Sequence, residues 1–309
     1  MTGGDDISWS SLGQIVREWA GDPAELTEVI PLTGGSVNNT LLLVTGDHRK
    51  AVCKITPHRV NRQLEIEAFQ LDLLRSLGVP TPRVYGVHVA SLDNPNSYLL
   101  MEYVDGITLA EAKKRLNPEE FDSLQEQLAD LVAKTHGHVR AEYGKVDGSD
   151  NHRTSDWAGF YRSLHSNAMK AAMDVKEIPV KTRRKLDKLH ERLDRYLAHD
   201  DEPRLCHGDL WAANVLCRQE EGRWRIAAII DPNLRFGHAE SELAYIDLFE
   251  TATSSFKKRY QERFRLHTDY HTVRKPIYQL YPLLNHVQLF GQRYVGPLVR
   301  VAERATSIV

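Results

Sequence analysis

Near Asp105–Gly106 the sequence changes its periodicity, and this change limits the possible folds more than any other feature. Before it, short apolar runs separated by turn-forming residues are typical of strands, and they cover Leu26–Leu32, Asn39–Thr45, Lys50–Ile55 and Tyr98–Val104. After it, apolar residues recur mostly at helical spacing. The pattern predicts an α+β fold of two lobes, strand-rich over residues 1–105 and mostly helical over residues 106–309.

Apolar residues at helical spacing predict helices in both lobes. One helix has a clear start, because Asn117 and Glu120 can cap its first turn on either side of Pro118. A buried strand predicted over Ile226–Ile230 interrupts the helical lobe. The other apolar stripes lie over Leu12–Trp19, Leu64–Leu77 and Leu186–Tyr196, the last as a single long helix.

Composition excludes several classes of protein. With 41% hydrophobic and 27% charged residues, the chain has the balance of a globular protein rather than a disordered one. A formal net charge of −2 gives no reason to expect nucleic acid or an anionic membrane as a partner. Residues 1–10 have no basic region before an apolar run, so we expect no signal peptide, and no apolar run approaches the roughly 18 residues of a membrane span. Cys53, Cys206 and Cys217 form no CxxC pair, so we expect a cytoplasmic protein without a disulfide framework.

The segment Leu205–Leu216 carries the most specific motif, which fits H-x-D-L-x-x-x-N. In this pattern the aspartate, here Asp209, handles the proton of an attacking hydroxyl, and the asparagine, here Asn214, holds Mg²⁺. The predicted strand Ile226–Ile230 then ends at Asp231, a second carboxylate that can chelate metal ions bridging the β- and γ-phosphates. Each residue alone is an ordinary turn or cap residue, but together they predict phosphoryl transfer.

A lysine in the strand-rich lobe predicts a matching phosphate contact. The run Ala51–Ile55 resembles the V-A-I-K strand, whose lysine, here Lys54, contacts the α- and β-phosphates. Glu67 on the following helix is the preferred partner for this cation, and Glu65 is the alternative. The competing interpretation is that these residues are solvated surface charges.

Two further segments are candidates for nucleotide contact. Gly34, Gly35 and Ser36 lie between the first two predicted strands, where a loop whose backbone N–H groups approach phosphates is expected, although glycine pairs commonly form simple turns. At the lobe boundary, backbone groups of Glu102 and Val104 are candidates for bonds to the adenine edge, with an ordinary linker as the alternative. The chain has no G-x-x-x-x-G-K-[ST] motif, which argues against a P-loop NTPase.

Other chemistries have little support. The sequence has no H-E-x-x-H, and His136-Gly137-His138 is interpreted as a helix end rather than a zinc site. It also lacks G-x-S-x-G, which argues against a serine hydrolase. The basic runs Lys181–Lys185 and Lys257–Arg259 are interpreted as solvated helix faces.

Together these motifs resemble the aminoglycoside-phosphotransferase and choline-kinase branch of the protein-kinase-like fold. More specifically, the chain resembles the fructosamine (ketosamine) kinase family from about Leu32 to Tyr294. The closer resemblance is carried by Trp211 within the loop motif, by Asp231-Pro232, and by the runs Phe236–Ala244, Tyr278–His286 and Phe290-Gly291.

The resemblance implies a bilobal kinase, with a small antiparallel sheet in its N-terminal lobe, that transfers the γ-phosphoryl group of ATP to a sugar hydroxyl of a ketosamine. By motif position it implies Asp209 as the base, Asn214 and Asp231 as magnesium ligands, and Lys54 with Glu67 at the phosphates. The acceptor would be a small amino sugar lying on Trp211. For the acceptor's ammonium group the candidates are Glu240 and Glu242, with packing or salt bridges inside the lobe as the alternative.

Three departures from the family pattern leave the acceptor open. The region from Tyr143 to Trp157 differs from the expected stretch, and Glu250-Thr251 replaces a glycine pair; both are expected to face the acceptor pocket. Ser36 stands where many members have a redox-active cysteine, so no disulfide switch is expected in that loop. An antibiotic or amino-alcohol phosphotransferase and a catalytically silent nucleotide-binding module remain alternatives.

Overall fold

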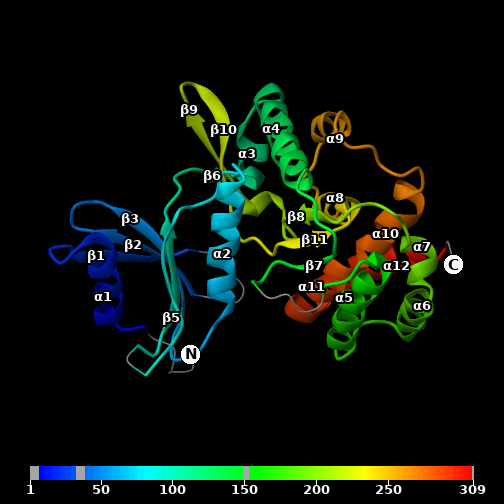
Figure 1. Cartoon of the computed structure of the whole chain (residues 1–309), viewed down its shortest axis with the longest axis horizontal. Coiled ribbons are helices and arrows are strands. Elements are labelled where there is room, and N and C mark those ends of the chain that lie inside the picture. Colours follow the sequence, from blue (N-terminus) through cyan, green and yellow to red (C-terminus); the bar gives the residue numbers. More distant parts are fainter. Residues whose placement is uncertain (1–6, 33–38, 93, 149–152, 308–309) are drawn as a thin grey trace.

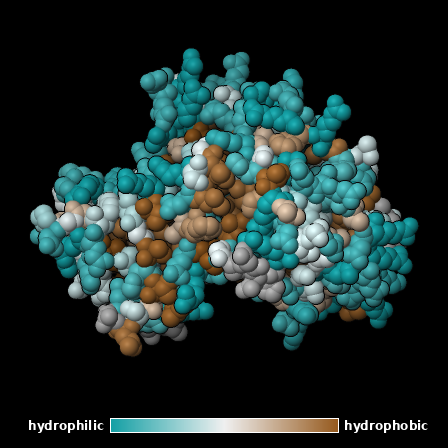
Figure 2. All heavy atoms as spheres, in the orientation of Figure 1, coloured by the Kyte–Doolittle hydropathy of each residue, from teal (hydrophilic) through white to brown (hydrophobic). Residues whose placement is uncertain are grey.

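The computed structural model describes residues 7–32, 39–92, 94–148 and 153–307. Two lobes stand side by side (Figure 1), a sheet-containing N-terminal lobe and a larger helical lobe. The predicted boundary residues Asp105 and Gly106 lie between β5 and β6, and the boundary itself stays a prediction. Space-filling atoms show a mostly hydrophilic face with hydrophobic atoms gathered over the middle of the molecule (Figure 2).

The N-terminal lobe is built on a five-stranded antiparallel sheet in the order β1-β2-β3-β5-β4. Because side chains alternate along a strand, β3 presents Ala51, Cys53 and Ile55 to helix α1, and Val52 to helix α2 on the other face. Lys54 therefore shares the face covered by α2. The elements are α1 (Trp9–Ala20), β1 (Leu26–Pro31), β2 (Asn39–Thr45), β3 (Lys50–Thr56), α2 (Gln63–Ser76), β4 (Val84–His88) and β5 (Ser97–Glu102).

The helical lobe surrounds the largest apolar core. Its longest helix begins as the sequence predicts: Asn117 accepts a hydrogen bond from the Glu120 N–H, and the Glu120 side chain bonds back to the Asn117 N–H. The helices are α3 (Leu109–Arg115), α4 (Pro118–His136), α5 (Trp157–Ala172), α6 (Val180–His190), α7 (Leu193–Leu197), α8 (Ala239–Leu248), α9 (Ser254–Gln261), α10 (Lys275–Tyr278), α11 (Leu280–Phe290) and α12 (Val295–Thr306).

The helical lobe also contains short strands and single-turn helices. They form two small antiparallel sheets, in the orders β10-β9-β6 and β7-β11-β8. The strands are β6 (Ile107–Thr108), β7 (Gly144–Lys145), β8 (Arg204–Cys206), β9 (Val215–Glu220), β10 (Arg223–Ile229) and β11 (Arg235–Gly237). The single-turn helices are η1 (Ala212–Asn214), η2 (Tyr270–Arg274) and η3 (Gly291–Tyr294).

Several elements differ from the sequence-based expectation, among them one helix and one strand of the large sheet. The long helix predicted over Leu186–Tyr196 is wrong: α6 ends at His190 and α7 begins at Leu193. The two parts have different main packing partners, α12 for α6 and α5 for α7. Strand β4 was not predicted; it is an edge strand whose place depends on pairing with β5 rather than on its own pattern. None of the helices in the described ranges combines the length and apolar character that a bilayer span requires.

Candidate active site

A cavity of about 300 Å³ lies between the lobes. Its apolar lining includes Leu32, Val52 and Met101 from the N-terminal lobe and Leu216 and Ile230 from the helical lobe. Lys54, Glu102, Val104, Trp211, Asn214 and Asp231, all singled out from the sequence, also line it. The cavity thus combines a slot for a flat apolar group with charged and amide side chains, as small-molecule sites commonly do.

Lys54 is the buried cation of this cavity. Its Nζ lies 2.5 Å from Oε1 of Glu67 and also contacts Oδ1 of Asp231. Burial lowers the pKa of Lys54, but the two carboxylates outweigh burial and raise it, so the amine is charged. Burial raises the pKa of Glu67, and Lys54 offsets only part of that rise. Of the two candidate partners, the structure pairs Lys54 with Glu67; Glu65 faces solvent beside Arg62.

Asp209 follows strand β8 on a tight turn. Gly208 has φ 82°, and a Cβ there would overlap the carbonyl oxygen of Asn233, so the turn requires glycine. The Asp209 carboxylate accepts a hydrogen bond from the Tyr245 hydroxyl and one of 3.3 Å from Asn214 Nδ2. Burial, opposed by these hydrogen bonds, raises the pKa of Asp209 to about 6.

Asn214 and Asp231 supply oxygen atoms beside that turn. Asn214 Nδ2 also donates to the Asp209 carbonyl at 2.9 Å, so its NH₂ group is engaged and its amide oxygen is the atom left for a ligand. Asp231 follows β10 with φ 57°, is one-third exposed, and uses Oδ1 to contact Lys54. An amide and a carboxylate oxygen are ligand types that Mg²⁺ prefers, so this donor set fits that ion.

Glu240 and Glu242 lie in the interior rather than in the cavity. Glu242 accepts a 2.6 Å hydrogen bond from the Gly208 N–H and one of 2.9 Å from His136. Burial would raise the pKa of Glu242, but these hydrogen bonds dominate and lower it to about 2. Glu240 accepts from the His267 N–H. The predicted contact with an acceptor's ammonium therefore has no support here, since both carboxylates already have partners inside the lobe.

Aromatic side chains extend from Asp209 along the helical lobe. Tyr245 lies with its ring centroid 4.8 Å from that of Phe249, and Phe249 lies 4.8 Å from His286 and 6.4 Å from Trp211. Trp211 is 37% exposed at the edge of the cavity. Sequence reasoning missed Tyr245. No sequence pattern marks it, because its hydroxyl reaches Asp209 only when helix α8 packs behind the loop.

Several predicted features lie elsewhere. Gly34, Gly35 and Ser36 fall outside the described residues. Trp157 and Thr251 are buried, whereas Glu250 is exposed, and the expectation that these two departures from the family pattern face an acceptor pocket stays a prediction. Cys53, Cys206 and Cys217 are buried and free.

The arrangement defines the class of protein. An antiparallel-sheet lobe and a helical lobe enclose a cavity with a buried lysine, and solved structures share this architecture, so the chain is a phosphotransferase of the protein-kinase-like fold acting on a sugar-like hydroxyl. The chain belongs to the fructosamine kinase family, whose model matches residues 8–306.

Similar proteins agree with this assignment. A probable ketoamine kinase of Enterococcus faecium is 28% identical, with 89% of this chain and 94% of that protein covered. A solved structure from Thermobifida fusca, described as a candidate fructosamine-3-kinase, has 27% identity and a TM-score of 0.75, covering 96% of this chain and 99% of the other. A thermostable mutant of aminoglycoside phosphotransferase APH(4)-Ia, bound to ADP and hygromycin B, shares the fold at a TM-score of 0.66 and 16% identity, covering 96% of this chain and 97% of the other.

Proposed function

We propose that the chain is an ATP- and Mg²⁺-dependent kinase that phosphorylates a sugar hydroxyl of a ketosamine, such as a fructosamine or ribulosamine. The observation that carries the proposal is that Asn214 and Asp231 line one cavity with the buried Lys54, and that Asn214 hydrogen-bonds to the Asp209 carboxylate beside it. Phosphoryl transfer has a loose transition state, so catalysis requires positioning and charge neutralisation more than covalent chemistry. This set of side chains supplies both.

The nucleotide would occupy the cavity with its adenine in the apolar slot. Backbone groups of Glu102 and Val104 are the proposed partners of the adenine edge, and Lys54 is the proposed contact of the α- and β-phosphates. The loop with Gly34, Gly35 and Ser36 remains the proposed cover of the phosphates. Nucleotides are bound in related folds, with ADP in one aminoglycoside phosphotransferase and GDP in another, which supports a nucleotide donor.

Asn214 and Asp231 would hold Mg²⁺. When bound, the ion supplies neutralisation of the charge on the phosphate oxygens. Asp231 keeps one carboxylate oxygen on Lys54, so it also links the phosphate-binding cation to the helical lobe.

Asp209 is the proposed base. Its carboxylate accepts the proton of the acceptor hydroxyl as the oxygen attacks the γ-phosphorus. A pKa of about 6 keeps it ionised at neutral pH, yet makes it more basic than an exposed aspartate. The Tyr245 hydroxyl donates to Oδ1 and fixes the carboxylate's direction, so Tyr245 is a positioning residue.

The acceptor would lie against Trp211, where an exposed aromatic face suits the C–H side of a sugar ring. We leave Glu240 and Glu242 out of the acceptor site because both are buried and hydrogen-bonded. The two-lobe division at Asp105–Gly106 is part of the same proposal. For the compartment, three buried free thiols favour the reducing cytoplasm.

A coupled ADP-release assay tests the proposal with glycated amines, free amino sugars, aminoglycosides and amino alcohols as acceptors. We expect glycated amines to give the highest kcat/KM. A higher kcat/KM with an aminoglycoside or amino alcohol would identify that class of compound, rather than a ketosamine, as the acceptor. ATP binding without phosphorylated product from any acceptor would support a silent nucleotide-binding module instead, a reading that the presence of Lys54, Asp209, Asn214 and Asp231 disfavours.

A further inference from the structure

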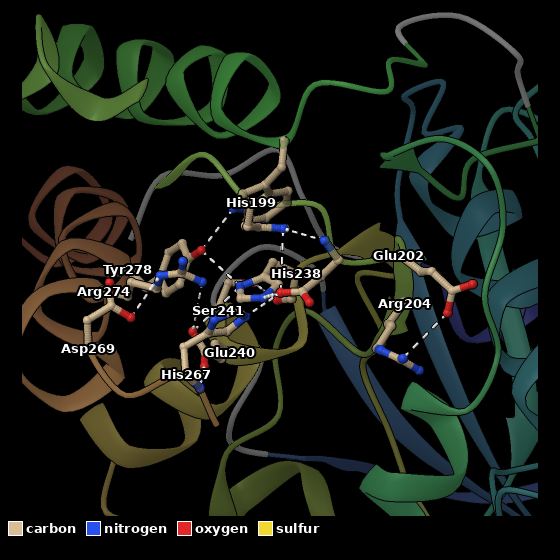
Figure 3. A network of polar contacts seen from close by, with 12 residues as sticks. His199, Glu202, Arg204, His238, Glu240, Ser241, His267, Asp269, Arg274 and Tyr278 are labelled. Carbon is tan, nitrogen blue, oxygen red and sulfur yellow. Dashed lines mark hydrogen bonds and ion pairs between the residues drawn. The ribbon is translucent and has the colours of Figure 1, made fainter. Parts of the chain in front are cut away.

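Three histidines converge on one carboxylate in the helical lobe, outside the residues that line the cleft. The Oδ2 atom of Asp201 accepts from His238 Nε2 at 2.8 Å and from His267 Nε2 at 2.5 Å, and it lies 3.5 Å from His199 Nδ1. Figure 3 shows these imidazole rings gathered with Glu240, Arg274 and Tyr278 around them. We call His199, Asp201, His238 and His267 the imidazole cluster.

The imidazole cluster joins three segments that are distant in the sequence. His199 and Asp201 follow α7, His238 precedes α8, and His267 follows α9. The side chains of His199 and His238 are 2% and 5% exposed, whereas those of Asp201 and His267 are 39% and 38% exposed. The cluster is therefore closed toward the core and open toward solvent, so a small ion can reach it without unfolding the lobe.

A hydrogen bond on the side away from Asp201 orients the ring of His238. Its Nδ1 lies 3.0 Å from the Tyr278 hydroxyl, which in turn accepts from Trp157 Nε1 at 2.9 Å. A hydrogen bond to the far nitrogen is how proteins orient histidines that bind a metal. His199 Nδ1 accepts the Asp201 N–H, and its buried Nε2 has no hydrogen-bond partner among the described residues. Hydrogen bonding therefore leaves one nitrogen of the cluster unsatisfied.

Charge in the cluster also favours a cation. The side chains of His199 and His238 are almost fully buried, and a neutral imidazole is the form that binds a metal. Asp201 contributes the carboxylate of the cluster, and its Oδ2 atom already accepts from two of the three histidines. The nearby Arg274 is balanced by Glu240 at 3.6 Å and Asp269 at 3.3 Å.

We propose that His199, Asp201 and His238, whose metal-binding atoms lie within 4.8 Å of one another, bind a divalent transition-metal ion of the zinc class, with His267 as the fourth ligand. Imidazole nitrogens with one carboxylate oxygen are a zinc-type donor set, whereas Mg²⁺ and Ca²⁺ take oxygen ligands. Tetrahedral zinc places ligand atoms roughly 3.3 Å apart. The ligand atoms of His199, Asp201 and His238 would therefore adjust to this spacing around the ion. Two protons would move: the Nε2 proton of His238 would pass to its Nδ1, which would then donate to Tyr278, and the Nε2 proton of the partly exposed His267 would pass to its Nδ1 through solvent.

A second group with metal-binding atoms, His136, Cys206 and Glu242, is the competing site. It is less suited, because His136 and Glu242 already bond each other, Tyr260 and the Gly208 N–H in the interior. A Cys206→Ser variant distinguishes the two sites experimentally, because Cys206 belongs only to the second group.

The test is titration of the full-length, metal-free protein with Zn²⁺ alone, without nucleotide. Calorimetry measures the binding, and thermal unfolding measures the change in melting temperature. Co²⁺ titration adds a ligand-field spectrum that reports tetrahedral nitrogen and oxygen ligands. The variants are Asp201→Asn and His267→Gln, both at partly exposed positions, with the exposed His271→Gln as the matched control. Their melting temperatures without metal show whether each variant folds.

We expect one equivalent of Zn²⁺ to bind and raise the melting temperature of the wild type, His271→Gln and Cys206→Ser. Affinity should fall at least tenfold in Asp201→Asn and His267→Gln, because each loses a ligand atom. If Asp201→Asn does not fold, His267→Gln decides. Absence of saturable binding by the wild type overturns the proposal, and so does unchanged binding in both cluster variants or loss of binding in Cys206→Ser alone. The proposal does not depend on the kinase assignment.

Discussion

The two sides of the cleft are built from different side chains. On the side that we assign to the nucleotide, Lys54, Glu67 and Asp231 form a compensated set of charges that joins the lobes. On the side that we assign to the acceptor, aromatic rings continue from Tyr245 to Trp211. The nucleotide side follows from short-range patterns in strands and loops, whereas the acceptor side depends on how helices α8 and α11 pack. Substitutions on the two sides should therefore fail in different ways.

The largest effect is expected at Asp209, where the two sides meet. Asp209→Asn removes the proposed base but keeps the size and the hydrogen-bonding shape of the side chain, so turnover should fall about 10²–10⁴-fold. ATP affinity and melting temperature should stay near wild type, since the nucleotide contacts lie elsewhere. Single-turnover transfer measured together with ATP binding checks this. Turnover within tenfold of wild type would refute the base assignment.

On the nucleotide side, Lys54→Met should lower stability as well as ATP affinity. Removing the cation leaves Glu67 and Asp231 without their shared partner, and breaking a buried pair in this way costs about 3–5 kcal/mol. Denaturant unfolding at neutral pH measures the loss. Lys50→Met, on the same strand but exposed, is the matched control, and adding Glu67→Gln to Lys54→Met should recover part of the stability. A Lys54→Met protein as stable as its Lys50→Met control would contradict the compensated-charge account.

Tyr245→Phe should shift a pH profile without disturbing nucleotide binding. The Tyr245 hydrogen bond lowers the pKa of Asp209, so its loss raises that pKa, and the acid limb of kcat/KM should move upward by about one pH unit. Tyr270→Phe is the matched control, because the Tyr270 hydroxyl has no hydrogen-bond partner in the described part of the chain. An unmoved acid limb in Tyr245→Phe would show that the hydroxyl does not act on the base.

The smallest effect is expected at Trp211. Trp211→Leu removes the exposed aromatic face, and aromatic packing of this kind contributes about 0.5–1.5 kcal/mol, so KM for the acceptor should rise about 2–10-fold. The KM for ATP should not change. Trp9→Leu, at an exposed position on α1, serves as the control. Equal changes in KM for the acceptor and KM for ATP would show that Trp211 does not act on the acceptor side alone.

The sequence predicts the nucleotide side of the cleft better than the acceptor side. The strand pattern predicts β2 over Asn39–Thr45 as observed, and alternation along β3 explains why Lys54 meets a residue of α2. Such patterns did not predict the contacts of Glu242 and Tyr245 with the loop that carries Asp209, because these contacts exist only when α8 packs behind that loop. The break between α6 and α7 was missed for the same reason: the apolar stripe continues through it, and only the packing partners differ.

The account depends most on the pairing of Asn214 and Asp231 as the magnesium site of the nucleotide. The direct test is the dissociation constant of ATP with and without Mg²⁺ for the wild type, Asp209→Asn, Asn214→Ala and Asp231→Asn. We predict that Mg²⁺ tightens ATP binding in the first two and that this gain shrinks at least tenfold in the last two. A gain of wild-type size in both Asn214→Ala and Asp231→Asn would contradict the account.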